Sequence, residues 1–404
     1  MLINMRNALM AGKRLPYDAE VEWLGSTGTQ WIDTGVIFKP SSDCVECQVM
    51  FSTLTQYAAA FGTQYNPGTG LYTQAARHNS NSGNWQLAPS INIGSVAIST
   101  TRFQNIVYRA TELGGCSIDG VVAKYGFSTT FADSFLTFGL FCMNQVPSAN
   151  WYMKGRINRY SVTRDGAKIL DFIPVRKGTV GYLYDRVSGA LFGNAGTGDF
   201  VLGPDVVPVE YIESHGTEWI DTGVIYNTTD RFEIFQDIRF IGGSQQKGSG
   251  WGAGGGVVYQ DGHYDTGNSQ MGTDPISIPE RLNATIVVQG TSSQYSYTGG
   301  GKTKTATRSN SLTAYAASTG YPFGQITANH GAMYTGLSAL LYGIKIYVNS
   351  DPIRSFRPVR VGTGSTWEGA MMDVLTRKVY RNQGTGAFTY GNDLRYPIPA
   401  EQPT

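Results

Sequence analysis

The stretch Val21-Glu22-Trp23-Leu24-Gly25-Ser26-Thr27-Gly28-Thr29-Gln30-Trp31-Ile32-Asp33-Thr34-Gly35-Val36-Ile37 recurs, with substitutions, later in this chain of 404 residues. The second copy runs from Val209 to Ile225 without a gap, and the offset at the shared Asp is 188 residues (221 − 33 = 188). A repeat of such long period indicates that a whole structural unit is duplicated. The sequence therefore predicts one domain built twice.

A second matched block closes each copy. Asp171-Phe172-Ile173-Pro174-Val175-Arg176 corresponds to Ser355-Phe356-Arg357-Pro358-Val359-Arg360, and Gly193-Asn194-Ala195-Gly196-Thr197-Gly198-Asp199-Phe200 corresponds to Arg381-Asn382-Gln383-Gly384-Thr385-Gly386-Ala387-Phe388. The offset is 184 at the first Phe (356 − 172 = 184) and 188 at the last (388 − 200 = 188), as loops of unequal length allow. Asp185 and Asp373 stand in a turn of this block. We expect them to accept backbone N–H bonds there, which explains both residues without catalysis.

Composition favours an all-β protein. Charged residues make up 15% of the chain, against about 25% in ordinary soluble domains, and Gly contributes 51 residues. The 24 Tyr and 18 Phe suit pleated strands, and Gly suits the tight turns between them. The net charge of +1 gives no electrostatic reason to expect nucleic acid or an acidic membrane as a partner.

Alternating hydrophobicity predicts the strands. Val45, Cys47, Val49 and Phe51 alternate with more polar positions, which is the period of a half-buried strand. The second copy repeats the pattern at Phe232, Ile234, Ile238 and Phe240, with Gln236 interrupting the apolar face. Further strands are expected around residues 30–36, 58–64, 70–73, 103–110, 115–119, 134–141 and 152–162, and a hairpin through Asp119-Gly120. Many short strands separated by turn residues are typical of a sandwich.

Four segments follow from the repeat: an arm at residues 1–18, domain one at 19–204, domain two at 205–393 and a Pro-containing tail at 394–404. Leu2, Met5 and Leu9 lie near one stripe of a short helix that Asn4 could cap. Such a short helix is marginal alone. The arm is therefore either disordered or an anchor that folds against a partner or a neighbouring subunit.

Cys44 and Cys47 form a CxxC pattern, so metal or redox chemistry has to be considered. The repeat argues against both, because it places Ile234 opposite Cys47 and Arg231 opposite Cys44. Four separated Cys in a chain of this size also do not make a disulfide framework. We interpret Cys47 as a core residue and Cys44 as an outward one.

No secretory signal and no run of membrane-spanning length is visible, so synthesis and folding in a cytoplasm are expected.

The repeated residues Gly28-Thr29-Gln30-Trp31-Ile32-Asp33-Thr34-Gly35, together with the closing block, resemble the concanavalin A-like jelly-roll domains. More narrowly, they are similar to the laminin-G-like repeats of phage and prophage virion proteins and of gut-bacterial surface proteins. The resemblance covers both copies and implies two tandem antiparallel jelly-roll sandwiches with a short N-terminal arm. It says little about function, since these domains include lectins, glycosidases and purely structural modules.

The sequence offers no catalytic set. Glycosidases of this fold would need paired carboxylates in a pattern such as Glu-x-Asp-x-x-Glu, which is absent. The four His fall at unrelated positions, and Asp33 and Asp221, each before Thr-Gly, are expected to make turns. Calcium sites occur in such folds, but no Asp-x-Asp ladder proposes ligands. We therefore predict a non-enzymatic protein without a cofactor or metal.

Binding is the stronger hypothesis, because aromatic faces stack on sugars while amides and carboxylates bond sugar hydroxyls. Two loop-rich regions carry such residues. The candidates are Tyr65, Tyr72, Asn84 and Trp85 in domain one, and Trp251, Tyr259, Asp261, His263 and Tyr264 in domain two. The alternative is that these aromatics pack across hairpins. Trp31 and Trp219 are assigned to the sandwich itself, because both copies hold them.

These observations predict a non-catalytic structural, decoration or fibre protein of a virion. The arm would attach it to sister subunits or other virion proteins, and the domains could bind host-surface glycans. A bacterial surface lectin or adhesin is the first alternative, and a glycoside hydrolase is the second.

Overall fold

The computed structural model describes residues 15–54, 57–65, 72–78, 83–87, 91–109, 116–122, 133–145, 148–224, 229–242, 245–251, 255–260, 263–265, 281–289, 292–299, 302–309, 325–326, 333–334 and 338–394. Within these ranges all regular structure is β-strand, and the chain divides into two compact units, Met1–Asp205 and Val206–Thr404. The strand β19 (Asp205–Pro208) joins them in sequence. The predicted all-β fold of jelly-roll sandwiches is confirmed.

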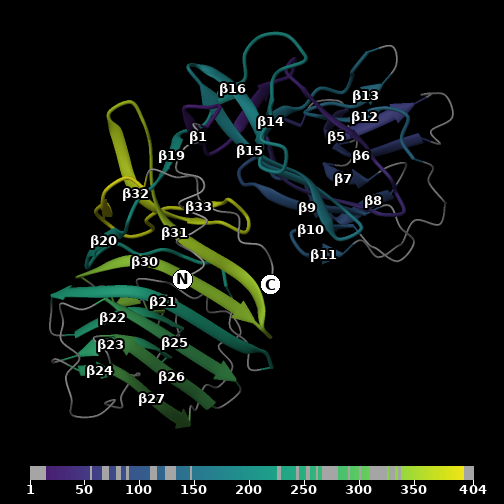
Figure 1. The fold of residues 1–404 in the computed structure, drawn as a ribbon. Helices are drawn as coiled ribbons and strands as arrows, with labels where there is room; N and C mark the ends of the chain where they lie inside the picture. Colours follow the sequence, from purple (N-terminus) through teal and green to yellow (C-terminus); the bar gives the residue numbers. More distant parts are fainter. Residues whose placement is uncertain are drawn as a thin grey trace. The chain divides into compact units, whose positions relative to one another are not determined.

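Domain one contains two antiparallel layers (Figure 1). The first runs in the order β3 (Ile32–Ile37), β12 (Thr137–Leu140), β5 (Ala58–Tyr65), β6 (Tyr72–His78), β7 (Asn84–Leu87) and β8 (Ile91–Ala97), and β13 (Asn144–Gln145) joins β5 in parallel. The second centres on β4 (Asp43–Phe51) and β14 (Lys154–Arg164), continued by β9 (Gln104–Arg109), β10 (Ser117–Ile118) and β11 (Val121–Val122). Its other side holds β15 (Ala167–Lys177), β16 (Val180–Asp185), β17 (Leu191–Phe192), β1 (Ala19–Val21), β2 (Leu24–Thr27) and β18 (Val201–Leu202).

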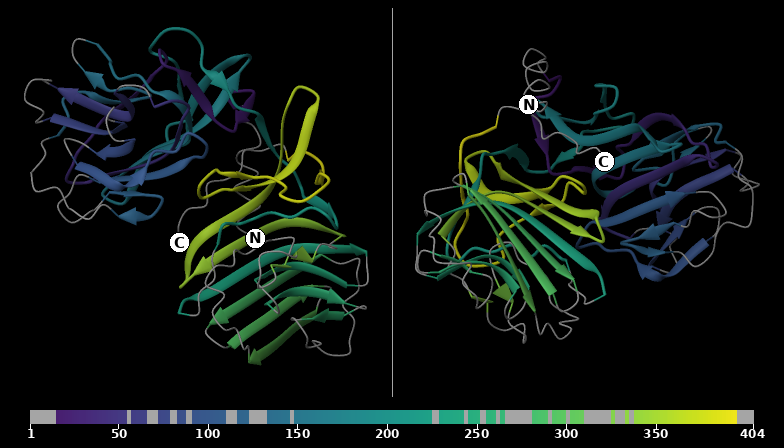
Figure 2. Two further views of the ribbon diagram at one scale, coloured as in Figure 1. Left: turned by 180° about the vertical axis from the view of Figure 1, so that it is seen from behind. Right: turned by 60° about the horizontal axis from the view of Figure 1, so that its bottom comes forward.

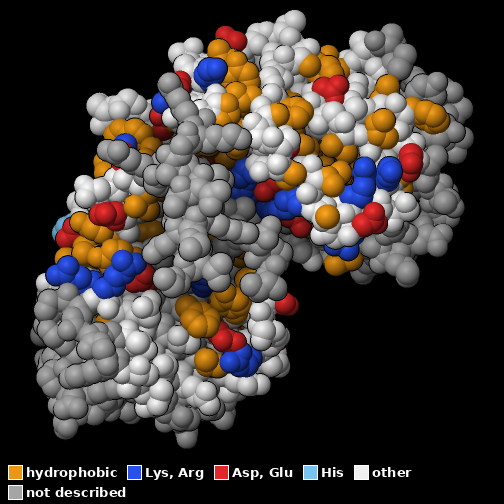
Figure 3. Space-filling model, viewed as in Figure 1, with side chains coloured by type: hydrophobic (Ala, Val, Ile, Leu, Met, Phe, Trp, Pro, Cys, Tyr) orange, Lys and Arg blue, Asp and Glu red, His pale blue; other side chains and the backbone are white. Residues whose placement is uncertain are grey.

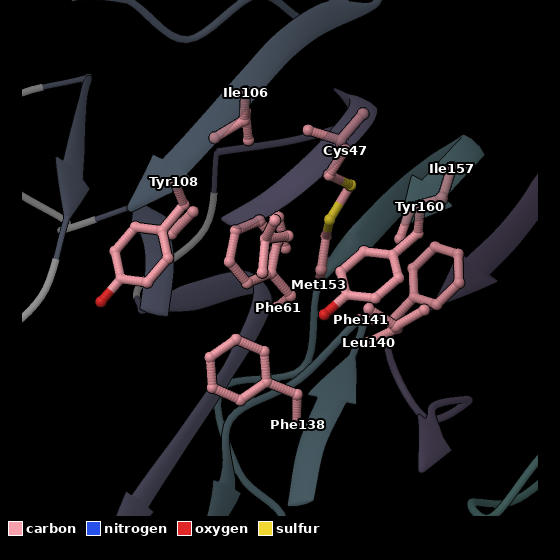
Figure 4. Packing of buried hydrophobic residues seen from close by; sticks show 14 of the residues in the cluster. Cys47, Phe61, Ile106, Tyr108, Phe138, Leu140, Phe141, Met153, Ile157 and Tyr160 are labelled. Carbon is pink, nitrogen blue, oxygen red and sulfur yellow. The ribbon is translucent and has the colours of Figure 1, made fainter. Parts of the chain in front are cut away.

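The core of domain one is an aromatic cluster between these layers (Figure 4). The Phe61 ring contributed by β5 lies 5.9 Å from the Tyr108 ring and 5.8 Å from the Tyr160 ring of the opposite layer. Cys47 is fully buried beside them, and Cys44 faces outward, as predicted. Burial raises the pKa of the Cys47 thiol far above its usual value, so this side chain acts as a core hydrophobe.

Domain two repeats the architecture. Its large sheet runs in the order β27 (Lys302–Ser309), β26 (Ser292–Gly299), β25 (Leu282–Gln289), β21 (Arg231–Gly242) and β30 (Ser338–Val348), strands that lie side by side in Figures 1 and 2. It continues through β31 (Asp351–Thr363), β32 (Thr366–Asp373) and β33 (Val379–Tyr380). The strand β20 (Ile212–His215) pairs with β30, and β34 (Thr389–Tyr390) pairs with β20. Smaller sheets are formed by β22 (Gln245–Trp251), β23 (Gly255–Gln260) and β24 (His263–Asp265), and by β28 (Gln325–Ile326) with β29 (Met333–Tyr334).

An asparagine clasp joins the first and last motifs of each copy. In domain one, Asn194 Oδ1 accepts hydrogen bonds from the backbone N–H of Trp31 (3.1 Å) and of Gly196 (2.8 Å). In domain two, Asn382 Oδ1 accepts the same bonds from Trp219 (3.0 Å) and Gly384 (2.8 Å). The repeated residues are therefore the ones that close each sandwich.

The repeated aspartates make turns, as predicted. Asp185 is buried, and its two carboxylate oxygens accept bonds from the backbone N–H of Asp171 (2.9 Å), Val187 (3.1 Å) and Ser188 (3.0 Å). Asp373 accepts the corresponding bonds from Ser355 (2.9 Å) and Leu375 (3.2 Å).

Asp33 and Asp221 each accept one bond from the glycine two residues later, at 2.9 and 2.8 Å. These bonds give both exposed turns a structural role that needs no catalysis.

One hairpin turn differs between the copies in a way that affects stability. The β14–β15 turn has left-handed Asp165 (φ 49°) and Gly166 (φ 79°), whereas the β30–β31 turn has Asn349 (φ 52°) and Ser350 (φ 73°). A non-glycine residue in this conformation lowers stability by about 1–2 kcal/mol. Glycine recovers only part of this, because it loses more conformational entropy on folding than other residues do. We expect Ser350→Gly to stabilise domain two by about 0.5–1 kcal/mol in denaturant unfolding, and Gly166→Ser to destabilise domain one similarly. Equal stability of Ser350→Gly and the parent chain would contradict this.

Residues 15–18, which the sequence analysis assigned to the arm, pack on domain one. The Tyr17 ring packs edge-on against the Tyr184 ring at 5.0 Å, and Asp18 accepts a hydrogen bond from the Gly178 backbone (2.7 Å). Leu15 joins the same cluster, so domain one begins there. Leu2, Met5 and Leu9 lie outside the described residues.

Candidate functional site

Trp85, one of the predicted sugar-stacking residues, lies in the core. Its indole Nε1 donates to Gln104 Oε1 (3.0 Å), and its ring packs edge-on against Phe51 at 5.4 Å. The side chain is fully buried, which corrects the expectation of a ligand contact. The reason is strand parity: Trp85 and Leu87 face inward, while Asn84 and Gln86 take the other face. Asn84 is half-buried on that outer face.

For the other predicted residues, the structure gives the backbone pairing of their strands. Tyr65 pairs with Tyr72 in the β5–β6 hairpin. In domain two, Tyr259 pairs with Tyr264, His263 with Gln260, and Trp251 with Gly255. Asp261 lies outside the described residues.

A stacked pair of aromatic rings that the sequence analysis missed forms the candidate site. Tyr57 and Trp151 have ring centroids 5.3 Å apart and planes inclined by 23°. Tyr57 is 44% exposed and Trp151 is half-buried. The pair lies on the outer face of the first layer of domain one. We call Tyr57, Trp151 and the neighbouring Arg77 the aromatic platform.

Both aromatic residues have strained backbones. Tyr57 has φ 44° and Trp151 has φ 51°, which is the left-handed region that bulky side chains avoid. Such a conformation costs about 1–3 kcal/mol and concentrates at ligand-binding and catalytic sites. The surrounding chain holds Trp151 in place, since its carbonyl accepts from the Ala59 N–H (2.9 Å) and its own N–H donates to Asn150 Oδ1 (2.7 Å).

Arg77 completes the platform. The guanidinium carbon lies 4.6 Å from the centroid of the Trp151 ring, and its Nε donates to Gln86 Oε1 at 2.8 Å. Burial lowers the pKa of Arg77, while the nearby Tyr57 opposes that shift. The guanidinium nevertheless stays charged at every physiological pH. The platform thus combines an aromatic face with a fixed cation.

Small residues form the floor beneath the platform. Ala59 and Ala75 are fully buried under Trp151, together with Met143. The register pairs Ala59 with Arg77 and Arg77 with Gln86, so these positions form one row across three strands. A larger side chain at Ala59 or Ala75 would displace the indole, because a cluster this closely packed has no space for additional atoms.

The platform is not duplicated. The strand register matches Cys47 to Gln236 rather than to Ile234 as the sequence analysis expected, an offset of 189 (236 − 47 = 189). This offset places Gln246 opposite Tyr57, and the offset of 184 places Thr335 opposite Trp151. Residues shared by both copies close the sandwich, whereas these aromatics belong to domain one alone. Their presence in a single copy is the sequence signal that could have found them.

Among the described residues no group of three or more His, Cys, Asp and Glu side chains could hold a metal ion. No helix in that part of the chain is long and apolar enough to cross a membrane. On the face shown in Figure 3, the described Lys and Arg side chains are interspersed with Asp and Glu.

No protein-family model and no curated protein matches the chain. Among solved structures it is similar to domains LG4-5 of the mouse laminin alpha1 chain, with TM-score 0.30 and 10% identity over 84% of this chain and 93% of that one. It is also similar to the NanB sialidase from Streptococcus pneumoniae, with TM-score 0.27 and 10% identity over 91% of this chain and 75% of that one. Similarity this weak carries no argument about activity.

Proposed function

We propose that the chain is a non-catalytic glycan-binding protein, and that the aromatic platform of domain one is its ligand site. The observation that carries the proposal is the stacking of Tyr57 on Trp151 with both backbones strained. Two neighbouring aromatic residues with strained backbones lower the stability of the fold. A need to present their rings to a ligand would explain why the strain is kept.

The chemistry of the platform suits a sugar. The exposed Tyr57 ring offers a face for the C–H groups of a pyranose. Arg77 and Gln86 supply a charged donor and an amide beside it, and Asn84 lies on the same face of the sheet. Such a combination of an apolar face with a few polar groups is typical of small-ligand sites.

The test is a glycan array with the full chain, followed by calorimetry on the strongest glycan. We expect Trp151→Ala and Tyr57→Ala each to weaken binding about thirtyfold, since truncating a central aromatic contact costs about 2 kcal/mol. Trp367→Ala is the matched control, because Trp367 is also half-buried and stacked by an arginine (Arg360, 3.8 Å) but lies in domain two. Unchanged affinity in both platform variants, or an array without any ligand, would overturn the proposal.

We also propose that the protein is carried on a virion, as the resemblance of its repeat implies, with residues 1–14 as the attachment to sister subunits or other virion proteins. Because Leu15 and Tyr17 pack on domain one, the informative truncation begins at Leu15. We expect light scattering to show an oligomer for the full chain and a monomer for the truncated one. Identical masses would exclude the arm from self-assembly. Detection in bacterial envelopes rather than in purified particles would favour a surface lectin.

A further inference from the structure

The outer face of the large sheet in domain two has an unusual composition. Phe232, Ile234 and Ile238 of β21 point into the core, so Glu233, Phe235 and Asp237 point outward. The register extends this outward face across β25, β26 and β27. One row runs Phe235, Thr285, Ser296, Thr305, and the next runs Asp237, Asn283, Thr298, Thr303.

No described outward position on β25, β26 or β27 carries a charge. These nine positions are Asn283, Thr285, Val287, Gln289, Gln294, Ser296, Thr298, Thr303 and Thr305. Thr298 and Thr303 bring their hydroxyls to 3.3 Å of each other across the strands. A soluble surface ordinarily carries about 25–35% charged residues, so an uncharged field of hydroxyls and amides is a distinct surface. We call these nine residues the hydroxyl face.

Aromatic side chains border the hydroxyl face. Phe235 is 38% exposed and packs edge-on against Tyr347 at 5.4 Å. Two ion pairs lie at this border: Arg281 holds Asp237 through Nε and Oδ1 at 2.6 Å, and Arg231 pairs with Glu233. Lys345, which is exposed and lies opposite Phe235 on β30, adds a positive charge. The guanidinium carbon of Arg281 also lies 3.8 Å from the centroid of the Tyr342 ring. The border thus presents aromatic rings beside two ion pairs and a lysine, whereas the hydroxyl face itself is uncharged.

We propose that the hydroxyl face binds a neutral polysaccharide whose chain runs across the strands. Thr, Ser, Asn and Gln both donate and accept hydrogen bonds, as sugar hydroxyls do. Adjacent strands lie about 4.8 Å apart, so the rows repeat their donors and acceptors regularly along such a chain. Phe235 supplies a stacking face at one end of a row. The absence of charge at the nine positions matches an uncharged polymer rather than an acidic one.

A second copy of the chain suits this face poorly. The central part of a stable protein–protein interface is about 65% apolar, whereas eight of these nine residues are polar. The proposed site lies in domain two and uses none of the residues of the aromatic platform, so each site can be lost without the other.

Affinity gel electrophoresis of the full chain tests the proposal, with dextran, mannan and a mixed-linkage β-glucan as neutral polymers and hyaluronan as the charged one. We expect at least one neutral polymer to retard the protein and hyaluronan to have no effect. Thr305→Glu and Phe235→Ala should each weaken retardation at least tenfold. Thr305 is exposed, so its variant tests the site even if Phe235→Ala folds poorly.

Thr366 is also an exposed threonine on a strand, β32, so Thr366→Glu is the matched control and should bind like the parent chain. Trp151→Ala should also retain this binding, which separates the hydroxyl face from the platform. Retardation by no neutral polymer, or unchanged retardation of Thr305→Glu, would overturn the proposal. So would a dimer in light scattering that Thr305→Glu dissociates, because the face would then be covered by a second copy.

Discussion

Gly196→Ala is expected to destabilise domain one by about 3 kcal/mol or more. A Cβ at Gly196 would lie 2.0 Å from the carbonyl oxygen of Thr29 and 2.9 Å from Trp31 Cδ1. Because this oxygen belongs to the backbone, the clash can be relieved only if the two motifs joined by the asparagine clasp move apart. Gly384→Ala should cost domain two as much, because its Cβ would meet the Thr217 carbonyl oxygen at 2.0 Å.

Denaturant unfolding measures this effect, with Gly193→Ala as the control. A Cβ at Gly193 would meet only the Tyr182 ring, at 3.3 Å, and that side chain can turn aside. We expect Gly193→Ala to cost under about 1 kcal/mol, the range of ordinary surface-level changes. If Gly193→Ala and Gly196→Ala lower the free energy of unfolding equally, the close contact between the two backbone segments at the clasp does not determine stability.

Asp185→Ala is expected to destabilise domain one by at least about 3 kcal/mol. The substitution removes a buried carboxylate that accepts from three backbone N–H groups and from the Ser188 hydroxyl; the bond from Asp171 is buried and the other three are partly buried. Each buried donor left without a partner costs about 1–3 kcal/mol, although water entering the space would recover part of the sum.

Asp33→Ala is the matched control for this substitution. Asp33 is also shared by both copies, but it is exposed and accepts only one backbone bond, from Gly35. Its loss should cost about 0.5–1 kcal/mol in the same denaturation experiment. Comparable losses for the two variants would show that burial of the Asp185 carboxylate is unimportant.

Local chemistry made much of the fold predictable. The Asp-Gly pair at residues 119–120 adopts left-handed angles (φ 53° and 80°) and forms the expected hairpin. Cys47 follows the alternation of its strand into the core. The alternation Asn84-Trp85-Gln86-Leu87 also carried the information that Trp85 is buried, but loop-like neighbours obscured the strand.

Presence in a single copy could have singled out Tyr57 and Trp151, but the sequence could not show that they form one platform. Tyr57, Arg77 and Trp151 come from distant segments, and only the tertiary pairing of β5 with β6, and of Ala59 with Tyr152, brings them together. The left-handed backbones of Tyr57 and Trp151 are imposed by packing rather than by residue preference. The docking of Tyr17 was missed because it lies outside the repeated stretch.

The asparagine clasp has a consequence for how this protein evolves. Asn194 ties the chain near the end of domain one to Trp31 near its start, and Asn382 does the same for Trp219, so each sandwich has its entry and exit side by side. A module of this kind can be copied in tandem or deleted without opening a neighbouring core. The number of copies can therefore change by recombination while the outer faces of each copy diverge on their own.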